Sequence, residues 1–235
     1  MRDTVTLSVA GLDFAMECKY PEIRNYCPEY LTDRPPLFTL RAEAREIAAE
    51  GLLLPDHTPP YWEYVCLHRA LAEQLPLYDG MVIHAGALEL DGKAYLFLGP
   101  SGIGKTTHLL LWRQCFPEAR IINGDKPVLR LREGRLWAFN TPWQGRERLG
   151  ADLSAPVEGL CFLSQSRENR IRPLTPEAAL LPMERQVYFP KGREAAERFL
   201  PLLDRLLTQC SAWALECDAT PAAAKLARRA LTQEK

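Results

Sequence analysis

A glycine-rich segment that ends in a lysine and two threonines is the strongest chemical signal in this sequence. It reads Gly99, Pro100, Ser101, Gly102, Ile103, Gly104, Lys105, Thr106 and Thr107. The spacing G-x-x-x-x-G-K-T lets successive backbone N–H groups turn inward around phosphate groups, and a helix expected to begin near Lys105 adds its positive N-terminal end. The lysine offers a charge to the β- and γ-phosphates, and the Thr106 hydroxyl offers a ligand to Mg²⁺. The segment therefore predicts a site for ATP and Mg²⁺.

The alternative to a phosphate-binding loop (P-loop) is a glycine-rich turn that matches the pattern by chance. The surroundings disfavour it, because residues 94–98 form an almost wholly apolar strand and residues 106–114 have helical character. A strand, the loop and then a helix is the context in which this motif binds phosphate.

Asp125 is the first candidate for a metal ligand and for a base. It follows the apolar strand expected over 119–123, and ligands collect at the carboxyl ends of strands in open α/β sheets. Asp125 can therefore approach the same phosphates as Lys105. The alternative is an acid that only helps the chain to turn beside Gly124.

Three further residues are weaker candidates. His84 lies in the strand expected over 81–90, which pairs through a tight turn with the strand that leads into the P-loop. It is either structural or close to the transferred phosphate. Arg146 follows the hairpin expected over 128–139, and is either a solvated loop residue or a charge that stabilises the phosphoryl group, as an arginine finger does. Trp143 is either a packing residue or part of an acceptor groove.

Composition excludes several classes of protein. The chain has 235 residues, 47% of them hydrophobic, and a formal net charge of -1, so no basic excess favours nucleic acid. No uninterrupted apolar run approaches the ~18 residues of a membrane span, and the N-terminus does not have the pattern of a signal peptide. The seven cysteines include no C-x-x-C pair, and a reducing cytoplasm is the expected compartment. The D-x-x-G and N-K-x-D motifs of Ras-like GTPases do not occur.

Periodicity predicts an α/β protein with two parts, residues 1–78 and residues 79–235. The first is a small β-rich α+β module, with a hairpin over about 5–16, a strand over 37–40, a helix over 42–50 that ends at Gly51, and a helix over 61–76. The second is a P-loop core with a mixed sheet. Besides the elements named above, it has a strand over 157–163, helices that start at Thr175 and Thr220, a helix over 191–209 and a strand over 212–216.

Residues 83–92, the P-loop and Ile122-Asn123-Gly124-Asp125-Lys126 together resemble the catalytic domain of HPr kinase/phosphorylase, which is related to ATP-dependent phosphoenolpyruvate carboxykinase. The resemblance covers roughly residues 80–165 and, more weakly, 212–230. It implies that Lys105 holds the β- and γ-phosphates and Thr106 ligates Mg²⁺. It also implies that His84 lies near the phosphate and that Asp125 acts as metal ligand, as base, or as both.

The sequence departs from that family at one position. The family has two adjacent acids, whereas Asp125 stands between Gly124 and Lys126. The resemblance favours a kinase that phosphorylates a serine or threonine hydroxyl of a small protein or peptide, and it allows a homo-oligomer. The departure supports a second hypothesis, a weakly active or inactive nucleotide-binding partner in a peptide-modification or regulatory system. A carboxykinase-like kinase of small molecules ranks last, because the chain is short for it.

Overall fold

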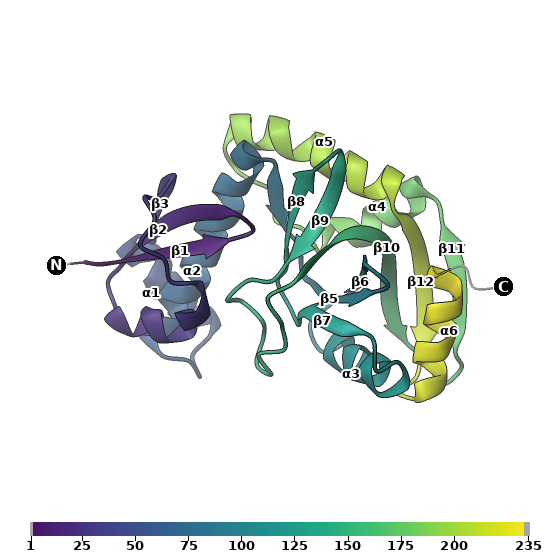
Figure 1. Ribbon diagram of the computed structural model, residues 1–235. Coiled ribbons are helices and arrows are strands. Elements are labelled where there is room, and N and C mark those ends of the chain that lie inside the picture. The colour runs from purple at the N-terminus through teal and green to yellow at the C-terminus, as the bar shows by residue number, and fades with distance from the viewer. Residues whose placement is uncertain (1, 233–235) are drawn as a thin grey trace.

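A computed structural model describes residues 2–232 and contains two β-sheets (Figure 1). The smaller sheet lies at one end of the molecule, with the strand order β1-β2-β3. Its elements and the helices that follow are β1 (Asp3–Val9), β2 (Leu12–Cys18), η1 (Pro21–Tyr26), η2 (Pro28–Tyr30), β3 (Phe38–Arg41), α1 (Ala44–Leu53), α2 (Pro59–Gln74) and η3 (Leu75–Tyr78).

The predicted N-terminal hairpin is confirmed. β1 and β2 pair antiparallel, and Ala10 and Gly11 make the turn with φ angles of 53° and 73°. A two-residue turn in which both residues have left-handed backbone angles matches the right-handed twist of the strands that it joins. The alternating apolar residues of both strands pack with α2 in one buried cluster, which includes Val5, Leu7, Val9, Leu12, Phe14, Met16, Leu67 and Leu71.

The prediction that Gly51 ends the first helix is wrong, because α1 continues to Leu53. A glycine inside a helix costs about 1 kcal/mol relative to alanine, which packing can offset. Here a Cβ atom at Gly51 would lie only 2.9 Å from the Trp62 ring. The glycine therefore lets α1 approach α2 closely.

The larger sheet is mixed and strongly curled. Its strands are β4 (Gly80–Val82), β5 (Ala85–Leu90), β6 (Lys93–Leu98), β7 (Arg120–Asn123), β8 (Val128–Arg132), β9 (Arg135–Phe139), β10 (Ser154–Gln165), β11 (Arg170–Leu174) and β12 (Ser211–Cys217). The main order is β4-β8-β9-β10-β6-β5-β7, with β12 also paired to β10 and β11 to β12. β10 runs parallel to both β6 and β12, so the carboxyl ends of these three strands lie at one edge.

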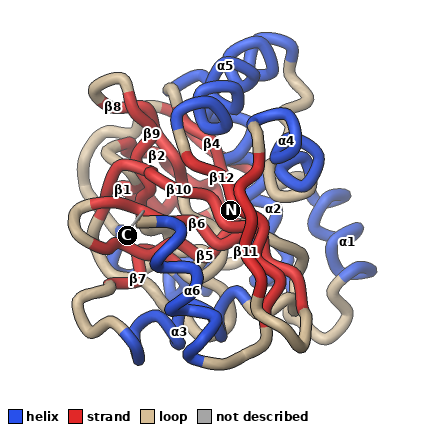
Figure 2. The backbone as a smooth tube through the Cα atoms, turned by 90° about the vertical axis from the view of Figure 1, so that its right-hand side faces the viewer, coloured by secondary structure: helices blue, strands red, loops and turns tan. Residues whose placement is uncertain are grey.

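Helices cover both faces of this sheet (Figures 1 and 2). α3 (Lys105–Cys115) and α6 (Pro221–Leu231) pack on one face, and α4 (Pro176–Glu184) and α5 (Arg193–Gln209) on the other. Alternate residues of β6 enter the two cores, Leu96 and Leu98 on the α5 side and Tyr95 and Phe97 on the α3 side. A strand buried on both faces explains the continuous apolar run in the sequence.

The predicted strand over 81–90 is two strands. β4 pairs with β8, whereas β5 pairs with β6 and β7. Ile83 and His84, between the two strands, pair with residues 186–187. The His84 N–H donates to the carbonyl of Gln186 (2.7 Å), and Ile83 forms a bridge with Val187. His84 therefore lies at the break between the strands rather than inside one. β11 was not predicted at all.

The module packs against the core through one apolar cluster. Val82, Val128, Phe139 and Trp143 of the core belong to the same buried cluster as the module's sheet and α2. The division at residues 78 and 79 stays a prediction. Across residues 2–232, no helix is long and apolar enough to cross a membrane.

The burial of His108 should make the stability of the protein depend on pH. It is 2% exposed, and burial lowers its pKa to about 4, whereas an unfolded histidine titrates near 6.5. The folded state therefore binds fewer protons, so stability falls as pH drops below 6.5. Between pH 7 and pH 5 the protein should lose about 2 kcal/mol of unfolding free energy through His108.

Urea unfolding at both pH values tests this, with His108→Gln as the comparison. Glutamine can keep an acceptor for the Trp112 Nε1–H, which bonds to His108 Nε2 at 3.0 Å, but it does not titrate. The variant should lose about 2 kcal/mol less than wild type on acidification. Equal losses in both proteins would contradict the prediction.

Candidate functional site

Three segments that sequence analysis singled out meet at one edge of the larger sheet. The glycine-rich segment 99–107, predicted to be a P-loop and called the P-loop from here on, leaves β6 after Leu98, and Leu98 pairs with Ala85, the first residue of the antiparallel strand β5. The Ala85 N–H donates to the carbonyl of Asp125 (3.0 Å), which follows β7. The P-loop, His84 and Asp125 therefore lie beside one another although up to 41 residues separate His84 from Asp125 in the sequence.

The P-loop has the backbone that its glycines allow. Gly99, Gly102 and Gly104 have φ angles of 151°, 79° and 111°, which residues with a side chain rarely adopt. Gly99 is also crowded, since a Cβ atom there would lie 3.0 Å from the Ile103 side chain and 3.2 Å from the carbonyl of Leu163. The glycines thus serve the turn, and Gly99 serves packing as well.

The helix after the loop presents an uncapped N-terminus. α3 begins at Lys105, no side chain caps it, and its first turn contains no acid. The first N–H groups of a helix have no partner within it and carry partial positive charge. This end of α3 therefore suits an anion such as a phosphate group.

Lys105 lies over the loop rather than in solvent. It is 7% exposed, and its Nζ donates to the carbonyls of Gly99 (2.8 Å) and Pro100 (3.2 Å). Burial lowers the pKa of Lys105 to about 8, although the negative charge of Asp125 acts in the opposite direction. The side chain is therefore still mostly charged at pH 7 and is held where a phosphate would approach.

Asp125 is held from both sides. His84 Nε2 lies 3.1 Å from one carboxylate oxygen, and Lys126 Nζ lies 3.0 Å from the other. Its backbone is fixed by Asn123, whose Oδ1 accepts hydrogen bonds from the N–H groups of Asp125 (2.8 Å) and Lys126 (2.7 Å). Sequence reasoning missed Asn123, although an asparagine that bonds to the backbone two residues later is a known turn former.

The electrostatics favour an ionised Asp125 and a neutral His84. Burial alone would raise the pKa of Asp125, but the hydrogen bond from His84 and the charge of Lys126 outweigh it and hold this pKa far below its usual value. Burial lowers the pKa of His84, with Lys126 and Lys105 adding to the effect and Asp125 opposing it. A neutral His84 can donate its Nε2 proton and so orient the carboxylate.

The loop that carries Arg146 runs against Asp125. A Cβ atom at Gly145 would lie 3.1 Å from the Cβ of Asp125, and the Lys126 N–H donates to the carbonyl of Trp143 (3.2 Å). Arg146 itself is exposed. Trp143 is 7% exposed and stacks on Tyr64, with ring centroids 5.1 Å apart, so it joins the module to the core by packing.

The module also reaches this site through α2. Burial raises the pKa of Tyr61, and the negative charge of Asp125 adds to that effect whereas the charge of Arg146 opposes it. Tyr61 therefore lies within electrostatic reach of both residues. Its ring stacks on His57, with centroids 4.3 Å apart. Sequence analysis gave no role to Tyr61, because its place near Asp125 depends on how the module packs.

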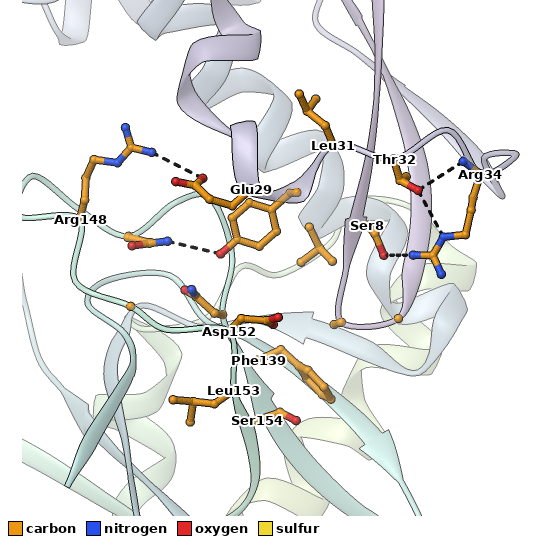
Figure 3. A pocket seen from close by; sticks show the side chains of 17 residues that line it. Ser8, Glu29, Leu31, Thr32, Arg34, Phe139, Arg148, Asp152, Leu153 and Ser154 are labelled. Atoms are coloured by element: carbon orange, nitrogen blue, oxygen red, sulfur yellow. Dashed lines mark hydrogen bonds and ion pairs between the residues drawn. The ribbon is translucent and has the colours of Figure 1, made fainter.

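A polar cavity of about 700 Å³ lies at the junction of module and core (Figure 3). Gln144 and Arg148 line it, and they belong to the loop that covers Gly124 and Asp125. From the module, Tyr30 accepts a hydrogen bond from Gln144 (3.3 Å), and Glu29 lies 4.0 Å from Arg148. Neither Asp125 nor a P-loop residue lines this cavity, so it borders the candidate site without being part of it.

The residues present fit a magnesium ion bound together with phosphates. Within residues 2–232, no three His, Cys, Asp or Glu side chains form a metal-binding group. Mg²⁺ does not need one, because it keeps several waters and is usually held by one or two carboxylates and the phosphates of its substrate. The hydroxyl of the half-buried Thr106, in the first turn of α3, and the Asp125 carboxylate are oxygen donors of the kind that Mg²⁺ takes.

This chain shows only a weak structural likeness to a known protein. No protein-family model and no curated protein matches this sequence. Among solved structures the chain is similar to the Hpr(Ser) kinase/phosphatase from Coxiella burnetii, at 13% sequence identity and a TM-score of 0.32, over 55% of this chain and 88% of that one. This is a weak likeness of fold.

Proposed function

We propose that this protein is an ATP- and Mg²⁺-dependent phosphotransferase that moves the γ-phosphate to a serine or threonine hydroxyl of a small protein or peptide. The observation that carries the proposal is the meeting of Lys105, at an uncapped helix N-terminus, with Asp125 and His84 at one sheet edge. Phosphoryl transfer needs little more than positioning and charge neutralisation, and these residues supply both.

Each residue has a role in this proposal. The P-loop N–H groups and Lys105 bind the phosphates, and Lys105 neutralises charge that moves toward the leaving oxygen. Thr106 and Asp125 would hold Mg²⁺, which would supply further charge neutralisation at the phosphate oxygens when bound. His84 orients Asp125. Arg146, exposed on the loop that runs against Asp125, would stabilise the transferred phosphoryl group.

The transfer itself is a displacement at phosphorus. The acceptor oxygen bonds to the γ-phosphorus, the bond from that phosphorus to the β–γ bridging oxygen breaks, and ADP leaves. The hydroxyl proton passes to the Asp125 carboxylate. Because His84 and Lys126 keep the pKa of Asp125 low, it is a weak base, and its larger contribution is to hold the hydroxyl in line.

The acceptor is proposed to approach from the module side. Arg146 belongs to the loop that covers Asp125, the polar junction cavity borders this loop, and Tyr61 of the module is within electrostatic reach of both Asp125 and Arg146. Mixed polar and charged groups suit a polar peptide segment better than an apolar one.

A second function is favoured by one observation, the ion pair of Lys126 with Asp125 at 3.0 Å. An ammonium group at this carboxylate competes with a metal ion. The protein would then be a nucleotide-binding partner that transfers little or no phosphate. Incubation with γ-labelled ATP, Mg²⁺ and candidate peptides or small proteins separates the two, since label on an acceptor supports the kinase and bound ATP without transfer supports the partner.

Replacing Lys126 with methionine tests this competition. Loss of the ammonium group should lower the Mg²⁺ concentration that half-saturates ATP binding by about tenfold, which corresponds to about 1.4 kcal/mol. Calorimetric titration of ATP at a series of Mg²⁺ concentrations measures it. Lys126→Arg keeps the charge and should behave like wild type. An unchanged Mg²⁺ dependence in Lys126→Met would mean that Asp125 does not ligate the metal.

A further inference from the structure

A second cavity, of about 320 Å³, lies on the other flank of the P-loop. Gly102, Gly104 and Thr107 form one wall, and the ends of β10 and β12 form another through Gln165 and Cys217. These two strands are parallel, with Gln165 opposite Cys217. Because the strand order is β12-β10-β6-β5-β7, this cavity and the His84–Asp125 pair lie on opposite sides of β6.

A triphosphate bound along the loop would run between these two flanks. If its terminal phosphate lies at the Asp125 flank, where transfer is proposed, the other end of the chain points to the opposite flank. Thr107 follows the proposed Mg²⁺ ligand directly and lines the cavity. The group attached to the α-phosphate would therefore enter this cavity.

The lining has the chemistry of a nucleoside site. Ile103, Leu111 and Leu163 provide apolar surface for a flat ring, and Gln165, Ser166 and Asp218 provide polar groups. Small-molecule sites combine these two kinds of surface, and their volumes begin at about 300 Å³. The neighbouring junction cavity is more than twice as large and lacks any P-loop residue.

The Asp218 carboxylate is fixed in place by hydrogen bonds to its neighbours. Its Oδ1 accepts from Asn169 Nδ2 (2.9 Å) and from Thr220 Oγ1 (2.7 Å), and its own N–H donates to Asn169 Oδ1 (3.0 Å). An acidic side chain fixed near the end of a strand is a known partner for ribose hydroxyls in other nucleotide-binding folds. Gln165 ties the same rim to the loop, since its Nε2 lies 3.5 Å from the carbonyls of Gly102 and Ile103.

We infer that this cavity between the P-loop and the ends of β10 and β12 is the nucleoside subsite, with the purine on Ile103, Leu111 and Leu163 and Asp218 accepting from a ribose hydroxyl. The inference rests on the proposed function and extends it, because it assigns the part of the substrate that the P-loop motif does not specify. It also divides the site, with the nucleoside on one side of β6 and the acceptor on the other.

Two variants and two ligands test the inference. Ala219 is exposed and lines the cavity, so Ala219→Trp fills it without disturbing the core. Asp218→Ala removes the proposed ribose acceptor. Binding of ATP and of inorganic triphosphate, both with Mg²⁺, is measured by calorimetry for wild type, both variants, Lys105→Ala and the exposed control Ala48→Trp, after thermal unfolding has shown that each protein is folded.

We expect Ala219→Trp and Asp218→Ala each to weaken ATP binding at least tenfold and to change triphosphate binding less than twofold, with Ala48→Trp unchanged for both ligands. If both variants bind ATP like wild type while Lys105→Ala does not, the nucleoside lies elsewhere and the inference fails, although the proposed function stands. If wild type binds neither ligand, the proposed function fails and the inference fails with it.

Discussion

Lys105→Ala is expected to weaken the binding of ATP with Mg²⁺ by about 100-fold. The ammonium group lies over the P-loop, 2.8 Å from the carbonyl of Gly99, and is 7% exposed. A hydrogen bond to a charged group contributes up to about 3 kcal/mol, and each 1.4 kcal/mol is a factor of ten in affinity. Burial increases the contribution, because a phosphate held there is screened less than in water.

Calorimetry with ATP and, separately, inorganic triphosphate measures the effect, and both ligands should lose affinity alike because Lys105 contacts phosphates. Lys93→Ala is the matched control. Lys93 is the first residue of β6, the strand that leads into the P-loop, and its side chain is exposed beside Glu158. A Lys105→Ala protein that is folded and binds ATP like wild type would remove the basis for a phosphate-binding loop here.

Asp125→Asn is expected to reduce phosphotransfer at least 100-fold when ATP and Mg²⁺ are both saturating. Asparagine has nearly the same shape and can still accept a hydrogen bond from His84 Nε2, which lies 3.1 Å from the carboxylate. What it loses is the negative charge that receives the hydroxyl proton and holds the metal. Loss of a positioned acid–base group typically costs a factor of about 10² to 10⁴.

The measurement is label transfer from γ-labelled ATP to candidate acceptors, with intact-mass analysis of each acceptor. Asp204→Asn, an exposed acid on α5, is the control and should transfer like wild type. Transfer by Asp125→Asn at the rate of wild type would exclude Asp125 from the chemistry. Wild type that binds ATP and labels no acceptor would favour the nucleotide-binding partner instead.

Much of the fold follows from short-range patterns. The alternation from Val5 to Met16 predicts the first hairpin, and the apolar run of residues 94–98 predicts a strand buried on both faces. Thr175 caps α4 as expected, accepting from the Ala178 N–H at 3.3 Å. These features depend on residues close together in the chain, so their periodicity and turn chemistry suffice.

The two wrong predictions of secondary structure have a common cause. Residues 81–90 have a continuous strand pattern, but Ile83 and His84 pair with a segment about 100 residues later, which splits the strand. Gly51 looks like a helix end until Trp62 packs against it. Long-range contacts decide both cases, and they override local propensity.

The features of the candidate site also fall into those that local sequence predicts and those that depend on long-range packing. Local sequence predicts the glycine-rich loop of residues 99–107, because its glycines set the backbone angles and Lys105 follows at a fixed spacing, and it also points to Asp125 and His84 as candidates. Packing of distant elements brings His84 and Lys126 to the two oxygens of Asp125, puts Tyr61 within electrostatic reach of Asp125, and forms the cavity on the far side of β6. The reason is physical. A loop's shape depends on its own torsion angles, whereas these contacts require strands and helices distant in the chain to pack together.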